Sequence, residues 1–314
     1  MSSINYRKPI APLEPYVPGK PIDDVKREFG LKSVVKIASN ENPYGFSQAA
    51  KDAVVASISS AMIYPDGYCT KLRNALSKKL GVAPEQLVFG AGADEIIAMV
   101  GKVFINEGDE CITGSITFSQ YEATVVAMGG KMVFADLKDD TYDLDAILSK
   151  ITDKTKVIFI ANPNNPTGTA FGDAAQRAFL AKVPSNILVI MDEAYSEYAD
   201  MPDFPKTLEY LNEYKNVMLM KTFSKIYGLA SFRVGYGVAC PEIITLFEKI
   251  RCPFNVSSQA QEAALAALGD ENFVFESNRK NVLTRNFVYA ELEKADIEYI
   301  ETQANFLIDR KSVV

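Results

Sequence analysis

The sequence predicts an α/β protein with a mostly parallel, doubly wound sheet and a smaller α/β domain formed from both ends of the chain. The first observation is a series of short apolar runs, each suited to a buried strand, at residues 87–89, 110–114, 132–135, 157–160, 187–191 and 217–220. The second is that helical stretches of roughly a dozen or more residues separate these runs, which is typical of parallel βαβ units. The 314 residues are enough for such a core and a second domain.

Composition excludes several classes of function. The chain carries 33 Lys and Arg against 40 Asp and Glu, a net charge of −7, which gives no electrostatic case for nucleic acid or an anionic membrane surface. It has no apolar run of about 18 residues and no apolar signal core at its start, so we expect a cytoplasmic protein. The four cysteines are too scattered for a CxxC zinc or redox site, and no metal is expected. Because histidine is absent, an enzyme of this sequence must move protons with lysine, tyrosine or a cofactor.

The amino-terminal region is predicted to lie extended over the surface, because prolines recur through it at positions 9, 12, 15, 18 and 21. We expect residues 1–30 to form an arm that contributes to the small domain. A strand is expected at 34–38, ending in the turn-forming cluster of 39–45, and a helix over 72–80 should end at Gly81. The large domain is assigned to residues 31–255. Helices are predicted over 241–251 and through 256–294, so that 256–314 form a connecting helix and the small domain.

A glycine turn follows the apolar run 87–89, with Gly90, Gly92 and Ala93 leading into a predicted helix. A strand, a glycine turn and a helix form an anion-binding geometry, because free N–H groups and the positive end of the helix dipole point at the ligand. The turn could also begin a dinucleotide fingerprint. However, the third glycine of GxGxxG would fall at Glu95, and the strand at 110–114 does not end in an acidic residue, which disfavours a Rossmann dehydrogenase.

Lys225 follows the uncharged run 217–220, in the loop TFSK of residues 222–225. Open α/β sheets bind ligands at the carboxyl ends of their strands, so this lysine is expected at the functional edge. A lysine that attacks a carbonyl needs a pKa below its free value of ~10.4, and burial beside another cation lowers it. Arg233 can supply that cation. The alternative from this window alone is an exposed lysine in a loop.

Two more loops with polar side chains follow predicted strands. Asn165 lies in ANPNNPTG (161–168), and Asp192 and Tyr195 lie in DEAY (192–195). An acidic pair after a strand could equally be a Walker B element, but the chain has no GxxxxGK[ST] to hold a nucleotide. The loops after these strands together offer the groups that a pyridoxal phosphate (PLP) site needs. These groups are a carboxylate, an amide, a phenol, an amine, a guanidinium and a turn that can bind an anion. Lysine would form an imine with this cofactor and later carry protons.

These motifs identify a family resemblance that covers most of residues 15–310. The chain resembles the fold-type I, PLP-dependent aminotransferases, and within them it is most similar to the histidinol-phosphate aminotransferases. The marks are ASNENPYG (38–45), the turn at Tyr64, GAGADE (90–95), TFSQY (117–121), ANPNNPTG, DEAY, TFSK and FRVGYG (232–237). The resemblance implies the PLP-dependent transferase fold of type I and a PLP cofactor. It also implies transamination of histidinol phosphate with 2-oxoglutarate in histidine biosynthesis, giving imidazole acetol phosphate and glutamate.

The resemblance further implies roles for single residues. Lys225 would form the imine, Asp192 would face the pyridine nitrogen, and Tyr195 with Asn165 would bond to the phenolic oxygen. Phe118 would stack on the cofactor ring. The phosphate would be held by Gly92, Ala93, Ser224 and Arg233, with Asp94 in the same turn and Tyr64 from the second subunit of a homodimer. Tyr16 and Asn42 resemble residues on the substrate side.

Alternatives within and outside this chemistry remain. A threonine-phosphate decarboxylase or an aromatic aminotransferase of the same fold would use the same cofactor groups. The family normally continues beyond Phe306 into an arginine-bearing segment that grips the anionic group of the substrate, whereas this chain stops at Val314. The alternative that is not an enzyme is therefore a PLP-binding protein without this substrate clamp.

Overall fold

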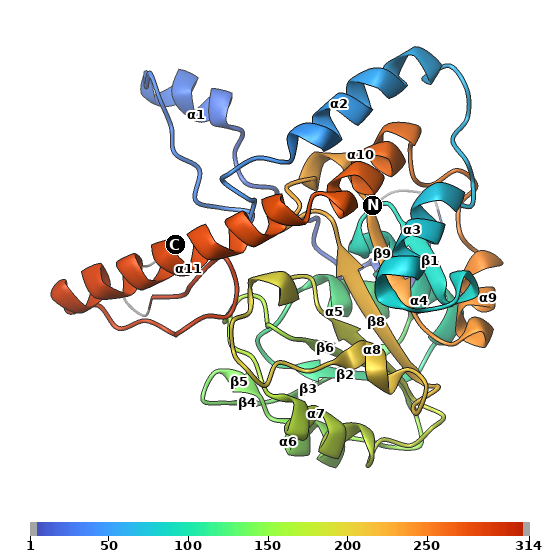
Figure 1. The fold of residues 1–314 in the computed structure, drawn as a ribbon. Coiled ribbons are helices and arrows are strands. Elements are labelled where there is room, and N and C mark those ends of the chain that lie inside the picture. The colour runs from blue at the N-terminus through green and yellow to red at the C-terminus, as the bar shows by residue number, and fades with distance from the viewer. Residues whose placement is uncertain (1–4, 310–314) are drawn as a thin grey trace.

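A seven-stranded sheet forms the centre of the computed structural model, which describes residues 5–309 (Figure 1). The strand order is β1-β9-β8-β7-β6-β2-β3. Only β9 runs against its neighbours β1 and β8 in this sheet, and the other pairs are parallel. The strands are β1 Leu87–Gly90, β2 Glu110–Gly114, β3 Lys131–Ala135, β6 Thr155–Ala161, β7 Leu188–Asp192, β8 Val217–Thr222 and β9 Gly235–Val238. The predicted mostly parallel, doubly wound sheet is confirmed.

Both faces of the sheet are buried, as the uncharged strand runs require. On β7, Val189 and Met191 belong to one apolar cluster, and Leu188 and Ile190 belong to another. Alternate residues of a strand point to opposite faces, so the two clusters lie on the two sides of the sheet. One cluster includes helices α4, α5 and α9, and the other includes α3, α6, α7 and α10. The sheet is therefore a middle layer, and its loops are left to form the edge.

The helices agree with most predicted positions. Gly81, with φ 68°, ends α3 as expected, because glycine adopts the left-handed conformation at low cost. The helical region predicted over 256–294 is divided at Asp270, whose carboxylate accepts a hydrogen bond from Phe273 N–H and caps the second helix. The helices are α1 Ile22–Phe29, α2 Gln48–Ser57, α3 Thr70–Leu80, α4 Ala93–Phe104, α5 Gln120–Met128, α6 Leu144–Ser149, α7 Asp173–Leu180, α8 Thr207–Tyr210, α9 Pro241–Glu248, α10 Ser258–Gly269 and α11 Glu271–Lys294, with 3₁₀ turns at Lys8–Ile10, Ile58–Ser60, Pro84–Gln86, Ser196–Tyr198 and Ala230–Phe232. Within residues 5–309, none of these helices has the length and apolarity needed to cross a membrane.

Two predictions for the amino-terminal region are wrong. Helix α1 interrupts the arm that was expected to be extended, and it stands away from the sheet (Figure 1). The prolines stop at Pro21, and the residues that follow place acidic side chains in the first turn, basic ones in the last and Gly30 at the end. The strand expected at 34–38 is not formed. Val35 and Ile37 are 85% and 95% exposed, because this segment has no neighbouring strand in the described chain.

Strand β9 and the hairpin of β4 (Leu137–Lys138) with β5 (Thr141–Tyr142) were not predicted. Strand β9 reads Gly-Tyr-Gly-Val, and glycine weakens the local signal for a strand. At its Gly235, a side chain would collide with the backbone of Gly92 and Ala93 at the start of α4. The glycines therefore serve the close packing of β9 against its neighbours, which becomes visible only in three dimensions.

Candidate active site

A cavity of about 330 Å³ opens at the carboxyl ends of the central strands. This is the edge where open α/β sheets bind ligands. The loops after β2, β6, β7 and β8 meet here with the start of α4. The predicted site residues that line the cavity are Tyr16, Ala93, Asp94, Phe118, Asn165, Asp192, Tyr195, Ser224, Lys225 and Arg233.

Lys225 lies in the loop after β8, and its side chain is partly buried. Its Nζ donates a hydrogen bond to the carbonyl oxygen of Ser39 at 3.2 Å and lies 5.3 Å from the centre of the Tyr195 ring. Burial lowers the pKa of the Lys225 amine, and the positive charge of Arg233 lowers it further, against the opposite effect of Asp94. A larger fraction of this amine is therefore neutral, and hence nucleophilic, than in an exposed lysine.

Removing either of the two charges beside Lys225 should shift the pKa of its amine, and the two shifts should have opposite signs. Arg233→Met removes a positive charge, so the pKa of Lys225 should rise, whereas Asp94→Asn removes a negative charge and should lower it. The measurement is the rate of reductive alkylation of Lys225 against pH in protein freed of ligands, followed by mass spectrometry. The exposed Lys131 in the same samples is the internal control. Shifts of the same sign in both variants would contradict the electrostatic explanation.

Asp192 ends β7 and lies 6% exposed at the cavity. Burial raises the pKa of its carboxyl group to about 6, although hydrogen bonds from Tyr121 Oη at 2.6 Å and Ala194 N–H at 3.1 Å favour the charged form. Sequence reasoning did not assign Tyr121. It is the last residue of the motif TFSQY and stacks on Phe159 at 4.9 Å, so its spacing from Phe118 was the available signal.

The loop that carries Asn165 uses its other two asparagines for its own structure. Asn162 bonds to the backbone of Phe171 through both amide atoms, at 3.2 Å and 3.1 Å. Asn164 donates to the carbonyl oxygen of Ile116 at 2.9 Å. Asn165 lines the cavity, and its amide forms no hydrogen bond with the part of the chain that the structure describes. This amide is left as a donor for a ligand.

Tyr195 is almost completely buried beside Phe306, with ring centres 5.0 Å apart. Its hydroxyl accepts a hydrogen bond from Asn40 Nδ2 at 3.1 Å, so its own proton can be donated to a ligand in the cavity. Sequence reasoning missed Asn40, although it stands in the turn-forming cluster 39–45. Both Ser39 and Asn40 have positive φ, 69° and 53°, and this tight turn brings their polar atoms to Tyr195 and Lys225.

The other end of the cavity can bind an anion. Gly92 is the N-cap of α4 and has no side chain, so the N–H groups of the first turn receive no side-chain cap within residues 5–309. Arg233 donates to Asp94 at 3.1 Å and to Ser224 at 3.3 Å. Its guanidinium occupies the place where a side chain at Gly92 would lie, and Gly92 has φ 78°. Glycine is thus favoured here by the backbone conformation, and any side chain would also have to displace the Arg233 guanidinium.

Three predicted residues are not among those that line the cavity: Gly92, which adjoins it at the start of α4, and Tyr64 and Asn42. Tyr64 is 79% exposed and stacks on Phe254, with ring centres 4.8 Å apart. Asn42 is buried, and its Nδ2 donates to the carbonyl oxygen of Ile226 at 2.8 Å and to Ser277 at 3.3 Å. Asn42 therefore ties the turn of 39–45 to the residue after Lys225. The substrate contact expected of Asn42 and the contact of Tyr64 with a second subunit stay predictions.

The residues present fit a phosphorylated pyridine aldehyde. The cavity combines a partly buried amine of lowered pKa, a buried carboxylate at Asp192 and a free amide at Asn165. At its far end, the start of α4 and Arg233 offer donors to a phosphate. A carboxylate opposite a ring nitrogen and an anion site at the other end match the two polar ends of PLP.

Comparisons with known proteins give a consistent result. A family model described as aminotransferase class I and II matches residues 32–309. The histidinol-phosphate aminotransferase of Caldicellulosiruptor saccharolyticus is 45% identical over 303 residues, which are 96% of this chain and 85% of that protein. The one of Moorella thermoacetica is 46% identical over 96% of this chain and 78% of its own length. The solved structure of histidinol-phosphate aminotransferase from Sinorhizobium meliloti, in complex with pyridoxal 5′-phosphate, matches with a TM-score of 0.90 and 27% identity, over 98% of this chain and 82% of that chain.

Proposed function

The chain belongs to the aminotransferase class I and II family, and on this premise we propose that it transfers the amino group of histidinol phosphate to 2-oxoglutarate. The products would be imidazole acetol phosphate and glutamate, in histidine biosynthesis. The observation that carries the proposal is the 45% identity, over 96% of the chain, to a protein of that name. The cytoplasmic location expected from the composition stays a prediction.

Different residues of the cavity would contact different parts of the proposed PLP. When bound, PLP supplies an aldehyde that condenses with amines and a ring that stabilises negative charge at the α-carbon of the substrate. Asp192 would hold a protonated ring nitrogen, because a buried carboxylate needs a positive partner to stay charged. Asn165 and Tyr195 offer donors to a phenolic oxygen, and Phe118 offers a ring face. The start of α4, Ser224 and Arg233 would hold the phosphate.

Lys225 is the group placed to move a proton at the α-carbon of the substrate. Its lowered pKa makes the neutral amine accessible, and the neutral form is the one that accepts a proton. The hydrogen bond to the carbonyl oxygen of Ser39 restrains Nζ at the cavity wall. The cation of Arg233 opposes protonation of Lys225, whereas Asp94 favours it. With histidine absent from the whole chain, lysine takes the role of general base.

A substrate panel tests the proposal. The purified protein with PLP and 2-oxoglutarate should form glutamate from histidinol phosphate, with kcat/KM at least about 100-fold above that for histidinol, which lacks the phosphate. Phenylalanine and threonine phosphate are the competing substrates. Preferential turnover of phenylalanine would indicate an aromatic aminotransferase, and release of carbon dioxide from threonine phosphate would indicate the decarboxylase. Binding of PLP without turnover of any of these substrates would support the binding protein that lacks the substrate clamp.

We further propose that the protein acts as a homodimer in which Tyr64 reaches the phosphate site of the second subunit. Met62, Ile63, Tyr64 and Tyr68 are 85%, 66%, 79% and 67% exposed, and so many exposed apolar side chains in one segment are typical of an interface. As expected from the sequence, we propose that the partners of the protein are small-molecule substrates. The expectation that it binds neither nucleic acid nor a membrane stays a prediction.

Mixed dimers test the contribution of Tyr64. Lys225→Ala and Tyr64→Phe subunits, each inactive or impaired alone, should give mixed dimers with about half the activity of the unchanged dimer, because one site then has both intact residues. Separately tagged subunits, purified as the mixed pair, provide the measurement. If Tyr64 serves its own subunit, the mixed dimer will show no gain over the Tyr64→Phe dimer.

A further inference from the structure

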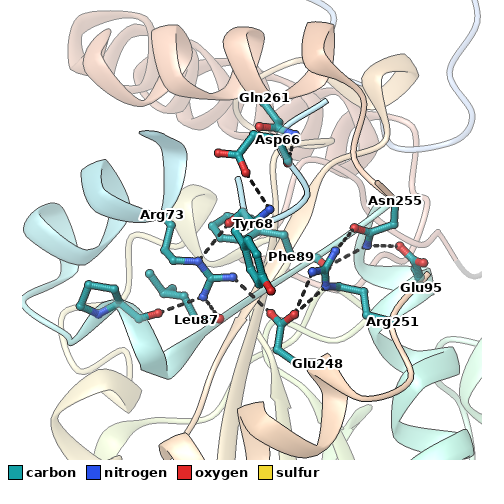
Figure 2. A network of polar contacts seen from close by, with 11 residues as sticks. Asp66, Tyr68, Arg73, Leu87, Phe89, Glu95, Glu248, Arg251, Asn255 and Gln261 are labelled. Atoms are coloured by element: carbon teal, nitrogen blue, oxygen red, sulfur yellow. Dashed lines mark hydrogen bonds and ion pairs between the residues drawn. The ribbon is translucent and has the colours of Figure 1, made fainter. Parts of the chain in front are cut away.

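A chain of polar contacts leads to the first turn of α4 through residues that do not line the cavity (Figure 2). Glu95, in the first turn of α4, accepts two hydrogen bonds at Oε2. One comes from Ala91 N–H at 2.6 Å and the other from Asn255 Nδ2 at 2.7 Å. Asn255 Nδ2 also donates to the carbonyl oxygen of Phe89 at 3.0 Å. The side-chain amide of Asn255 thereby connects Phe89, which precedes the glycine turn, with Glu95, which follows it.

Asn255 is itself held by a rigid group of charged side chains. Its Oδ1 accepts from Arg251 Nη1 at 2.8 Å, and Arg251 is paired with Glu248 at 2.8 Å. Glu248 also pairs with Arg73 at 3.2 Å, and Arg73 donates to the carbonyl oxygen of Tyr68 at 3.0 Å. The side chains of Arg251 and Arg73 are only 10% and 14% exposed. Such well-packed, hydrogen-bonded ion pairs keep one geometry, unlike pairs on the open surface.

The placement of Glu95 has a specific effect on the donors of the turn. Its carboxylate occupies the Ala91 N–H, so the N–H groups that remain for a ligand are those of the first turn of α4, at the cavity. Its negative charge at a phosphate site would by itself weaken phosphate binding. A carboxylate in this position is therefore useful for the geometry it imposes. Asn255 supports that geometry with a neutral donor and brings no further charge of its own.

We infer that Glu95 and Asn255 are positioning residues that hold the turn at Gly92 in its anion-binding conformation. This inference rests on the proposed function, because the anion is the phosphate of PLP. Neither residue lines the cavity, so both act through the turn. The expected signature is a loss of affinity confined to ligands that carry the phosphate.

The experiment compares binding of PLP with that of pyridoxal, which lacks the phosphate, to protein freed of cofactor. Glu95→Ala removes both hydrogen bonds and should weaken PLP binding by about 10-fold or more, with pyridoxal changed by less than about 3-fold. Asn255→Ala should act in the same direction with a smaller effect. Glu95→Gln keeps an acceptor oxygen and should restore binding of PLP. Glu122→Ala, which removes an exposed carboxylate from the first turn of α5, is the matched control and should change neither affinity.

A second measurement separates this inference from the proposed function. Amide hydrogen exchange of residues 90–94 in the cofactor-free protein should be faster in Glu95→Ala than in Glu95→Gln, whatever ligand the site takes. If the unchanged protein binds no PLP, the proposed function fails while the exchange result still tests the turn. Equal weakening of PLP and pyridoxal, or unchanged exchange in Glu95→Ala, would overturn the inference. If Glu95→Ala does not fold, Asn255→Ala provides both measurements.

Discussion

Lys225→Ala is expected to lower the transamination rate by about 10⁴-fold, the largest effect of any single substitution in this chain. The substitution removes the amine that would condense with the cofactor and also the general base of the proton transfer. No second lysine can take its place, because Lys225 is the only lysine among the residues that line the described cavity. The neighbouring Lys221 is committed to an ion pair with Glu197 at 2.8 Å.

Two measurements test this prediction: trapping of the cofactor on the protein and the transamination rate. Borohydride treatment of the unchanged protein with PLP should leave a reduced adduct on Lys225, found by peptide mass spectrometry, and Lys225→Ala should carry none at the site. Lys131→Ala removes an exposed lysine at the start of β3 and should keep both the adduct and the full rate. An adduct on another lysine, together with turnover by Lys225→Ala, would refute the assignment.

Asp192→Asn is expected to lower the rate by about 10²- to 10³-fold, with the fold retained. Asparagine has nearly the same shape and can still accept the hydrogen bond from Tyr121, but it cannot hold a positive charge on a ring nitrogen. The effect should therefore appear in kcat more than in the thermal stability. Comparable activity of Asp192→Asn and the unchanged protein would show that the carboxylate does not face the cofactor.

Tyr121→Phe is a milder test of the role of Asp192, because it removes one hydrogen bond to the carboxylate and leaves the carboxylate itself in place. Loss of a hydrogen bond to a charged group should reduce kcat/KM by about 10-fold. Because that bond lowers the pKa of Asp192, its removal raises the pKa further above the ordinary value, and the acid limb of kcat/KM should move to higher pH. Tyr210→Phe also removes a tyrosine hydroxyl bonded to a carboxylate, at Asp173, and serves as the matched control without a shift. An unmoved acid limb in Tyr121→Phe would refute the coupling.

The predicted fold was correct where local pattern and burial agree. The strand expected at 110–114 coincides with β2, and the others differ from the observed strands by one or two residues at an end. The predictions failed where a segment depends on a partner. Residues 34–38 alternate like a strand but have no strand beside them, and β9 is rich in glycine but is inserted between β1 and β8. Strand formation needs hydrogen bonds from a neighbour, which local sequence does not specify.

The position of a residue at the cavity was predictable when the residue followed a strand at the carboxyl edge of the sheet. Asp192, Lys225 and Asn165 all do so, and the parallel sheet brings them into one cavity. Tyr121 and Asn40 were missed because each lies at the site through a hydrogen bond to a residue that is distant in the sequence. Tyr121 serves Asp192, 71 positions away, and Asn40 serves Tyr195, 155 positions away. The number of positions between the two members of such a pair does not indicate that they are in contact.

The sequence by itself determined which chemical groups are present: a lysine, a carboxylate, an amide and a glycine turn, each placed after a strand, in a chain without histidine. Tertiary structure alone decided which partner each of these groups receives, and hence its charge and orientation. Glu95 and Asn255 are 160 positions apart, yet they share one hydrogen bond at the first turn of α4. The physical reason is that propensity and turn chemistry act over a few residues, whereas burial and hydrogen bonding depend on every segment packed around a group.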